Sequence, residues 1–200
     1  MQTEKRHPIA HALHIIGTGR TTLNNYIYGP GAILSAIFGE AGESLEDHIG
    51  PNRAPVCENQ RWLRRYLTDE AVVVLSIGFR LIRYGVKAEE AFRLGFRFVF
   101  GTDAPEGHPV RWSPLYPEGE TILIINSPSP ITEDAEGRTA FAFVGDRYHG
   151  SMAEAARLAG HEEDGDPLVV LNLSHLCRSI ALWLGEDPAT FMRPAAQVAA

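Results

Sequence analysis

The stretch from Thr68 to Leu94, TDEAVVVLSIGFRLIRYGVKAEEAFRL, decides the fold expected for this chain. Apolar residues recur at the spacing of one helix face both before and after Gly85. A glycine at that position can adopt the left-handed conformation that ends a helix. The stretch therefore predicts two amphipathic helices folded back on each other, although any antiparallel helix pair with a glycine turn satisfies the same pattern.

The same stretch resembles the second half of MerR-type DNA-binding domains, over roughly residues 64–94. The positions that carry the resemblance are Arg64, Arg65, Tyr66, Leu67, Thr68, Asp69, Glu70, Val72, Leu75, Leu81, Gly85, Val86, Glu89, Glu90 and Leu94. The resemblance implies a winged-helix-like DNA-binding part, in which this helix pair braces the reading head. Gly42, Ser44 and Leu45 then stand where the family has its turn and recognition helix, with a shortened spacing.

Composition indicates a globular, cytoplasmic protein. A chain of 200 residues with 44% hydrophobic content can bury one full core or two small ones. The longest apolar stretches fall short of the roughly twenty residues that a membrane span needs, and the first residues lack a signal-peptide pattern. Cys57 and Cys177 are too few for a disulfide framework or a four-thiolate zinc site. We therefore expect no membrane association and no cofactor.

Charge divides the chain into two halves. Residues 1–101 hold 12 Lys and Arg against 10 Asp and Glu, whereas residues 102–200 hold 6 against 15. The formal charges are therefore +2 and −9, within a net charge of −7. Such an asymmetry suggests that the first half tolerates a polyanion and the second repels one, although an acidic solubilising surface would also produce it.

Domain organisation follows the same division. Residues 102–120 are rich in proline and glycine and predict a connection between a helical part at 1–101 and an α+β part at 121–200. The fold class is therefore α+β. A mostly helical N-terminal part, for which a winged-helix-like arrangement is one option, precedes a β-hairpin packed with helices. Before residue 50, short helices are expected at 22–28, 32–38 and 44–48.

The C-terminal part carries strand and helix signals. The β-rich runs at 121–126 and 139–144 predict a hairpin around a loop with Pro128, Pro130 and Gly137. Ser151 and Glu154 form a capping box for a short helix. Asp166 and Pro167 predict the start of a helix that runs to Leu184, and Asp187 and Pro188 a last turn.

Arginines interleaved with aromatic residues favour nucleic-acid binding. In RWLRRY, at residues 61–66, guanidinium groups could bind phosphates while the rings pack beneath them. The DNA-binding residues that we expect are Arg61, Arg64, Arg65, Tyr66, Arg80 and Arg83. A solvated helix face, with these arginines paired to nearby Glu and Asp residues, explains the same pattern.

Catalytic and metal sites have weaker sequence support. His7, His11 and His14 have a helical spacing that could bind zinc or nickel, but a histidine-rich terminus explains them equally. Asp146, His149 and His175 could converge as metal ligands or as an acid/base pair, although nothing in the sequence brings them together. We therefore predict no metal site, and the catalytic residues are unknown.

Two classes of function remain. The first is a DNA-binding transcriptional regulator with a C-terminal sensing or dimerisation part, in which a homodimer binds duplex DNA because one small module makes too few contacts for tight specific binding. The second is a small α+β module that binds or inhibits a protein partner through its acidic C-terminal half, or a metal-dependent enzyme. The first is the main prediction.

Overall fold

The computed structural model places the chain in two compact units, Met1–Gly101 and Thr102–Ala200. The division falls at the residue where the charge balance changes. The structure describes residues 6–29, 32–40, 42–50, 66–100, 114–116, 119–126, 129–133, 139–142, 145–149, 153 and 167–192. The two units are considered separately below.

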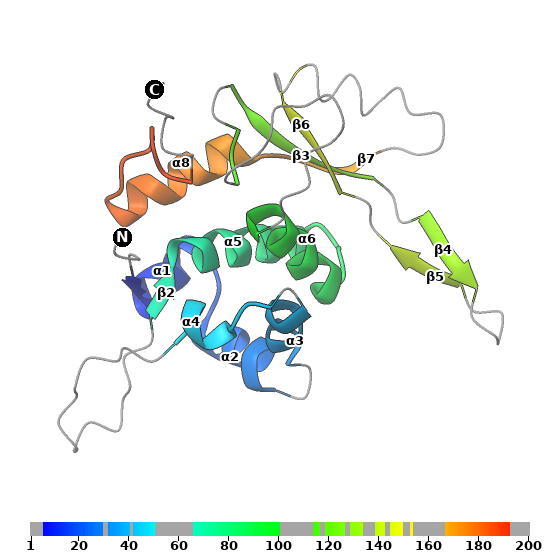
Figure 1. Cartoon of the computed structure of the whole chain (residues 1–200), viewed down its shortest axis with the longest axis horizontal. Helices are drawn as coiled ribbons and strands as arrows, with labels where there is room; N and C mark the ends of the chain where they lie inside the picture. The colour runs from blue at the N-terminus through cyan, green and yellow to red at the C-terminus, as the bar shows by residue number, and fades with distance from the viewer. Residues whose placement is uncertain are drawn as a thin grey trace. The chain divides into compact units, whose positions relative to one another are not determined.

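The first unit is mainly helical (Figure 1). Its elements are β1 (Arg6–Pro8), α1 (Ile9–Ile16), α2 (Arg20–Tyr28), α3 (Ile33–Glu40), α4 (Leu45–His48), β2 (Tyr66–Thr68), α5 (Asp69–Arg83) and α6 (Ala88–Phe100). β1 and β2 pair as antiparallel strands, with His7 opposite Leu67. This small sheet places the start of the described chain beside the residues that lead into α5.

The predicted helix pair is confirmed as α5 and α6, and both of its sequence signals have a structural role. Thr68 caps α5, because its hydroxyl accepts a hydrogen bond from the Ala71 backbone N–H at 3.2 Å. Gly85 turns the chain between the helices with φ of 92°. All residues of α5 from Ala71 to Phe79 are buried, so this helix lies at the centre of the fold.

Two glycines allow α5 and α6 to approach each other closely. A Cβ atom added to Gly78 would lie 2.3 Å from Phe92 Cδ1, and one added to Gly95 would lie 2.7 Å from the Val74 carbonyl oxygen. The second neighbour is backbone and cannot rotate away. The pair therefore depends on the absence of a side chain at these positions, although glycine is a poor helix former.

We expect Gly95→Ala to lower the free energy of unfolding of the first unit by about 1–3 kcal/mol, because the added methyl group forces α5 and α6 apart. Gly39→Ala is the matched control, since Gly39 is an exposed helical glycine with no heavy atom within 4 Å of the added Cβ. It should stabilise α3 by about 0.5–1 kcal/mol. Urea unfolding followed by circular dichroism compares the two, and stabilisation by both would contradict the close approach.

Phenylalanines along α6 anchor the smaller helices. Phe92, Phe96 and Phe100 follow one another at four-residue intervals on that helix. Phe96 packs edge-on against Phe38 of α3, with 4.9 Å between ring centroids, and Phe100 lies 5.0 Å from the His48 ring of α4. One face of α6 therefore receives α3 and α4 through aromatic contacts.

The expected N-terminal helices are observed with small shifts, as α2, α3 and α4. The structure adds α1, which was not predicted because Pro8 stands directly before it. Pro8 is in fact the residue that precedes the first turn, where a missing backbone N–H leaves no helix hydrogen bond unmade. The proline therefore marks the start of α1.

The second unit contains a three-stranded antiparallel sheet, in the order β6-β3-β7, and a separate strand pair (Figure 1). Its elements are β3 (Thr121–Asn126), β4 (Ser129–Glu133), β5 (Thr139–Ala142), β6 (Gly145–His149), β7 (Pro167–Asn172) and α8 (Leu173–Leu184). α8 follows β7 directly and packs against β3. This arrangement completes an α+β fold.

The predicted pairing of the run at 121–126 with the run at 139–144 is wrong. β3 pairs with β6 and β7, whereas β5 pairs with β4. The interpretation failed because Pro128 and Pro130 indicated a loop, yet Ser129–Glu133 forms a strand. A register shift between Pro130 and Thr132 accommodates the missing backbone N–H of Pro130 in that strand.

The helix predicted from Pro167 to Leu184 is wrong in its first part. Pro167–Asn172 is strand β7, and α8 begins only at Leu173. An unbroken apolar run fits a strand and a buried helix equally, and here the β-branched Val169 and Val170 indicated the strand. The true helix start is Asn172, whose side chain accepts from the His175 backbone N–H at 2.8 Å.

The end of the predicted connection is part of the second unit. Leu115 and Tyr116 are buried, and the Leu115 backbone N–H donates to the Met192 carbonyl oxygen at 3.2 Å. The Tyr116 N–H donates to Thr121 Oγ1, and the Thr121 N–H in turn donates to Ser174 Oγ. These bonds join the segment, β3 and α8. Within the described ranges, no helix has the length and apolar character required to cross a bilayer.

Candidate nucleic-acid interface

α1 and α2 are joined by a short turn that contains two glycines. Gly17 ends α1 in the left-handed conformation, with φ of 72°, and its backbone N–H points to the Leu13 and His14 carbonyl oxygens. Thr18 follows, and Gly19 precedes the first residue of α2, where its carbonyl oxygen accepts from the Leu23 N–H at 3.1 Å. α1 and α2 are therefore consecutive helices joined by a short turn that depends on glycine.

α5 holds the turn between these helices in place. The Arg83 guanidinium donates a hydrogen bond to the Gly17 carbonyl oxygen, across 66 positions of sequence. This oxygen lies at the C-terminal end of α1, where backbone carbonyls lack helical partners and a cation is favoured. Arg83 therefore fixes the turn against the central helix of the unit.

Tyr26 anchors the buried side of α2. Its ring packs edge-on against Phe79 and Phe92, with centroid separations of 5.7 and 5.2 Å, and these two rings contact each other at 5.2 Å. Leu23 and Ile27 on the same helix are fully or almost fully buried. α2 is thus held on the α5–α6 pair by an aromatic trio, and its own aliphatic residues are buried.

The opposite side of α2 is exposed and polar. The exposed residues of the helix are Arg20, Thr21, Thr22, Asn25 and Tyr28. Their side chains offer hydroxyl, amide and guanidinium groups, and the helix contains no acidic residue. A helix anchored on one face that presents hydrogen-bonding groups without negative charge on the other is suited to contact a polyanion.

The structure brings one of the sequence-predicted residues, Arg83, to the α1–α2 turn. Arg80 and Arg83 are both exposed and lie in the last turns of α5, which contact α2 through Phe79 and the α1–α2 turn through Arg83. Arg80 follows Phe79 directly on that helix. Arg61, Arg64 and Arg65 lie outside the described residues.

Tyr66, one of the predicted DNA-binding residues, packs beneath an arginine. Only 5% of it is exposed, and the Arg6 guanidinium lies over its ring, 4.1 Å from the centroid. Its backbone N–H donates to the Gly50 carbonyl oxygen at 3.0 Å. Tyr66 therefore carries Arg6 through a cation–π contact rather than offering its own ring to a ligand.

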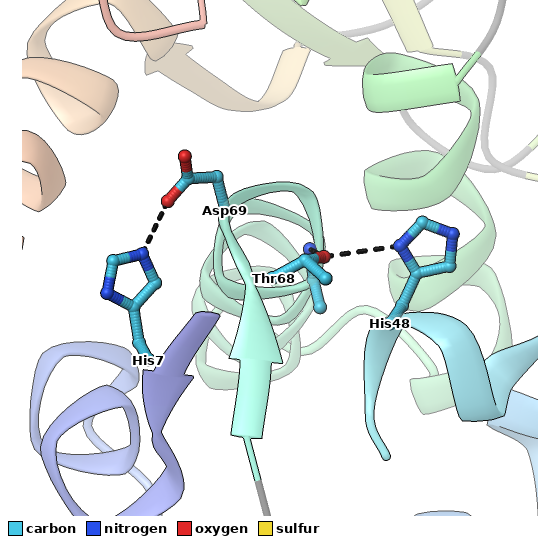
Figure 2. A network of polar contacts seen from close by, with 5 residues as sticks. His7, His48, Thr68 and Asp69 are labelled. Atoms are coloured by element: carbon cyan, nitrogen blue, oxygen red, sulfur yellow. Dashed lines mark hydrogen bonds and ion pairs between the residues drawn. The ribbon is translucent and has the colours of Figure 1, made fainter. Parts of the chain in front are cut away.

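A network of polar contacts surrounds the start of α5 (Figure 2). His7 Nε2 lies 2.5 Å from Asp69 Oδ1, on one side of the helix start. On the other side, His48 Nδ1 lies 3.2 Å from Thr68 Oγ1, and His48 Nε2 lies 3.1 Å from Glu43 Oε2. Figure 2 shows the two histidines approaching neighbouring residues from opposite sides.

Both ring nitrogens of His48 have partners. Nδ1 faces Thr68 Oγ1, which also accepts the Ala71 N–H. Nε2 faces the Glu43 carboxylate. His7, His48 and Thr68 are buried and matched with partners, so this network clamps β1 and α4 to the first turn of α5.

The histidines that were considered as metal ligands lie on different elements or faces. His7 is on β1 and is buried against Asp69, whereas His11 and His14 are exposed on α1. In the second unit, Asp146 and His149 pair in register with Ile124 and Thr121 of β3, and His175 is exposed on α8. Among the residues that the structure describes, no three His, Cys, Asp or Glu side chains could hold a metal ion.

Comparisons with known proteins add no family to this geometry. No protein-family model matches the chain, and no match was found among the curated proteins or the solved structures. The assignment of a function therefore depends on the contacts described above.

The helix that follows Gly42 is shorter than the resemblance implies for a recognition helix. Gly42 does adopt a positive φ of 76°, but the α4 helix that follows Ser44 has only four residues, which is one turn. The exposed helix is α2, beyond the glycines at 17 and 19. The sequence signal for α2 is the apolar run 9–16, followed by Gly-Thr-Gly and a polar helix.

Proposed function

We propose that residues 1–101 bind duplex DNA through α1, the Gly17–Gly19 turn and α2, with α2 lying in the major groove. One observation carries this proposal. α2 is anchored through Leu23, Tyr26 and Ile27 while its other face is exposed, polar and free of acidic residues. A recognition helix needs both properties, because its position must be fixed while its surface reaches base edges.

The α5–α6 pair acts as the brace in this proposal. Arg83 holds the turn, and Phe79 and Phe92 support Tyr26, so a rigid helix pair determines where α2 lies. Arg20 at the start of α2 and Arg80 on α5 provide phosphate contacts on either side of the groove. These contacts position the protein on the duplex, and α2 adds sequence preference.

The charge distribution supports DNA binding by the first half of the chain and a different role for the second half. The first half of the chain carries +2 and the second −9, so the second half is repelled by DNA and is free for another role. We assign to it sensing or dimerisation, which makes the protein a transcriptional regulator. A homodimer is expected because one module of this size makes few base contacts, and sedimentation velocity measures its mass.

A salt series tests the proposal. The full chain is titrated onto a fluorescent random-sequence duplex between low and moderate salt, together with Arg20→Ala and Arg80→Ala. We expect the logarithm of affinity to fall linearly with the logarithm of salt concentration, and each variant to lower the slope by about 0.9 if it removes one phosphate contact. Arg178→Ala is the control, since Arg178 is an exposed helical arginine of the second unit and should leave the slope unchanged.

The competing outcomes are distinct. Absence of binding at low salt by folded protein would overturn the proposal. Binding with the same slope in all three variants would place the contacts away from α2 and α5. Preference for single-stranded RNA over the duplex would exclude insertion of a helix into a DNA major groove.

A further inference from the structure

The exposed face of α2 has a row of neutral hydrogen-bonding groups. Thr21, Asn25 and Tyr28 follow one another at the i, i+4 and i+7 positions of one helix face, and all three are exposed. Leu23 and Ile27 lie on the buried side. The middle of the row is Asn25, whose neighbours Thr21 and Tyr28 have no formal charge at neutral pH.

Asn25 has the chemistry that distinguishes one base. In the major groove, adenine offers the N7 acceptor and the N6 amino donor, and an asparagine amide matches both at once. Guanine offers two acceptors, so it favours an arginine or lysine, and cytosine offers a donor that favours a carboxylate. Arg20 is the one charged residue of α2, and it stands a full turn before Asn25.

Asn24, the neighbouring amide, is less suited to this role. It is only partly exposed and has contacts within the protein, whereas Asn25 is on the exposed face in the middle of the helix. The backbone carbonyl of Asn25 accepts from the Gly29 N–H at 3.0 Å, so the main chain at this position is fixed. A fixed backbone lowers the entropy lost when the amide aligns with a base edge.

We propose that Asn25 reads an adenine in the DNA site of this protein, through a paired hydrogen bond to N6 and N7 in the major groove. This inference rests on the proposed function, because it requires α2 to lie in that groove. It goes beyond that function in naming the base and the residue. Thr21 lies one turn closer to the helix start, where its methyl group can contact a neighbouring thymine.

The experiment combines a protein variant with an altered base. A duplex is selected from a randomised pool with the full-length protein, and each adenine is then replaced in turn by 7-deazaadenine, which lacks only the N7 acceptor. For wild-type protein we expect about 5- to 150-fold weaker binding at one position, from the loss of a paired base contact. With Asn25→Ala, the same replacement should have no effect.

Asn25→Ala should not destabilise α2, because alanine is a better helix former than asparagine and Asn25 is exposed. A difference between the variant and the wild type therefore reports on DNA binding. Thr22→Ala is a second exposed α2 variant, and it should retain the full response to 7-deazaadenine. An equal response of wild type and Asn25→Ala at every adenine, or salt-dependent binding without any response, would overturn the adenine assignment and leave DNA binding standing. Absence of binding to the starting pool at low salt would overturn both.

Discussion

Replacement of Phe92 by alanine should lower the free energy of unfolding of the first unit by about 3–5 kcal/mol, as expected for a fully buried phenylalanine. Phe92 contacts the rings of both Tyr26 and Phe79, so its loss removes aromatic contacts as well as buried area. A Cβ added to Gly78 would lie 2.6 Å from Phe92 Cε1, so the ring fills the space beside that glycine. Truncation leaves a cavity between α5 and α6 that neither helix can fill.

The measurement is urea unfolding of the full chain, with hydrogen exchange of peptides covering 69–100 to assign the transition to the first unit. Tyr84→Ala is the matched control, since Tyr84 is an aromatic residue of the same helix pair that is 59% exposed. It should change stability by no more than about 0.5 kcal/mol. Similar small losses for the two variants would show that the aromatic trio does not hold the fold.

Phe92 also links stability to the proposed function. The ring supports Tyr26, and Tyr26 supports α2, so Phe92→Ala at a temperature where the protein remains folded should weaken duplex binding. Phe98→Ala removes another buried phenylalanine of α6 and provides the comparison. A selective loss of binding in Phe92→Ala would separate the support of α2 from general loss of stability.

Local signals explain what the sequence could predict. The α5–α6 pair was predictable because the apolar spacing, the Thr68 cap and Gly85 all lie within one continuous stretch. The α+β class followed from β-rich runs and helix signals in the same way. By contrast, the pairing of β3 with β6 and β7 depends on contacts between segments that are distant in sequence. Pro130 also made the segment of β4 look like a loop, so the true partner of β5 was missed.

The candidate interface was only partly predictable, because its supports are distant in sequence. Arg80 and Arg83 were expected to contact DNA, but the hydrogen bond from Arg83 to Gly17 spans 66 positions and gives Arg83 a second, structural task. The His7–Asp69 contact spans 62 positions. Such pairings leave no periodic pattern in the sequence, so the clamp formed by His7 and His48 could not be predicted.

Thr68→Ala tests that clamp and should lower the free energy of unfolding by about 2–4 kcal/mol. Thr68 is fully buried, and its hydroxyl contacts both the Ala71 N–H and His48 Nδ1. Alanine removes the helix cap and leaves a buried histidine nitrogen without its partner. Thr68→Ser retains the hydroxyl and loses one methyl group, so it should cost only about 1 kcal/mol.

A double-mutant cycle with His48→Phe separates the two contributions to this loss. Phenylalanine at position 48 has no ring nitrogen that needs a partner. In that background, Thr68→Ala should lower the free energy of unfolding only by the contribution of the helix cap, about 0.5–2 kcal/mol. Stability is measured by urea unfolding for all four proteins. If Thr68→Ala lowers the free energy of unfolding equally beside histidine and beside phenylalanine at position 48, Thr68 stabilises only α5. The contact with Glu43 would then be enough to hold His48. A smaller cost beside phenylalanine would establish that α4 is joined to the start of α5 through one hydroxyl group.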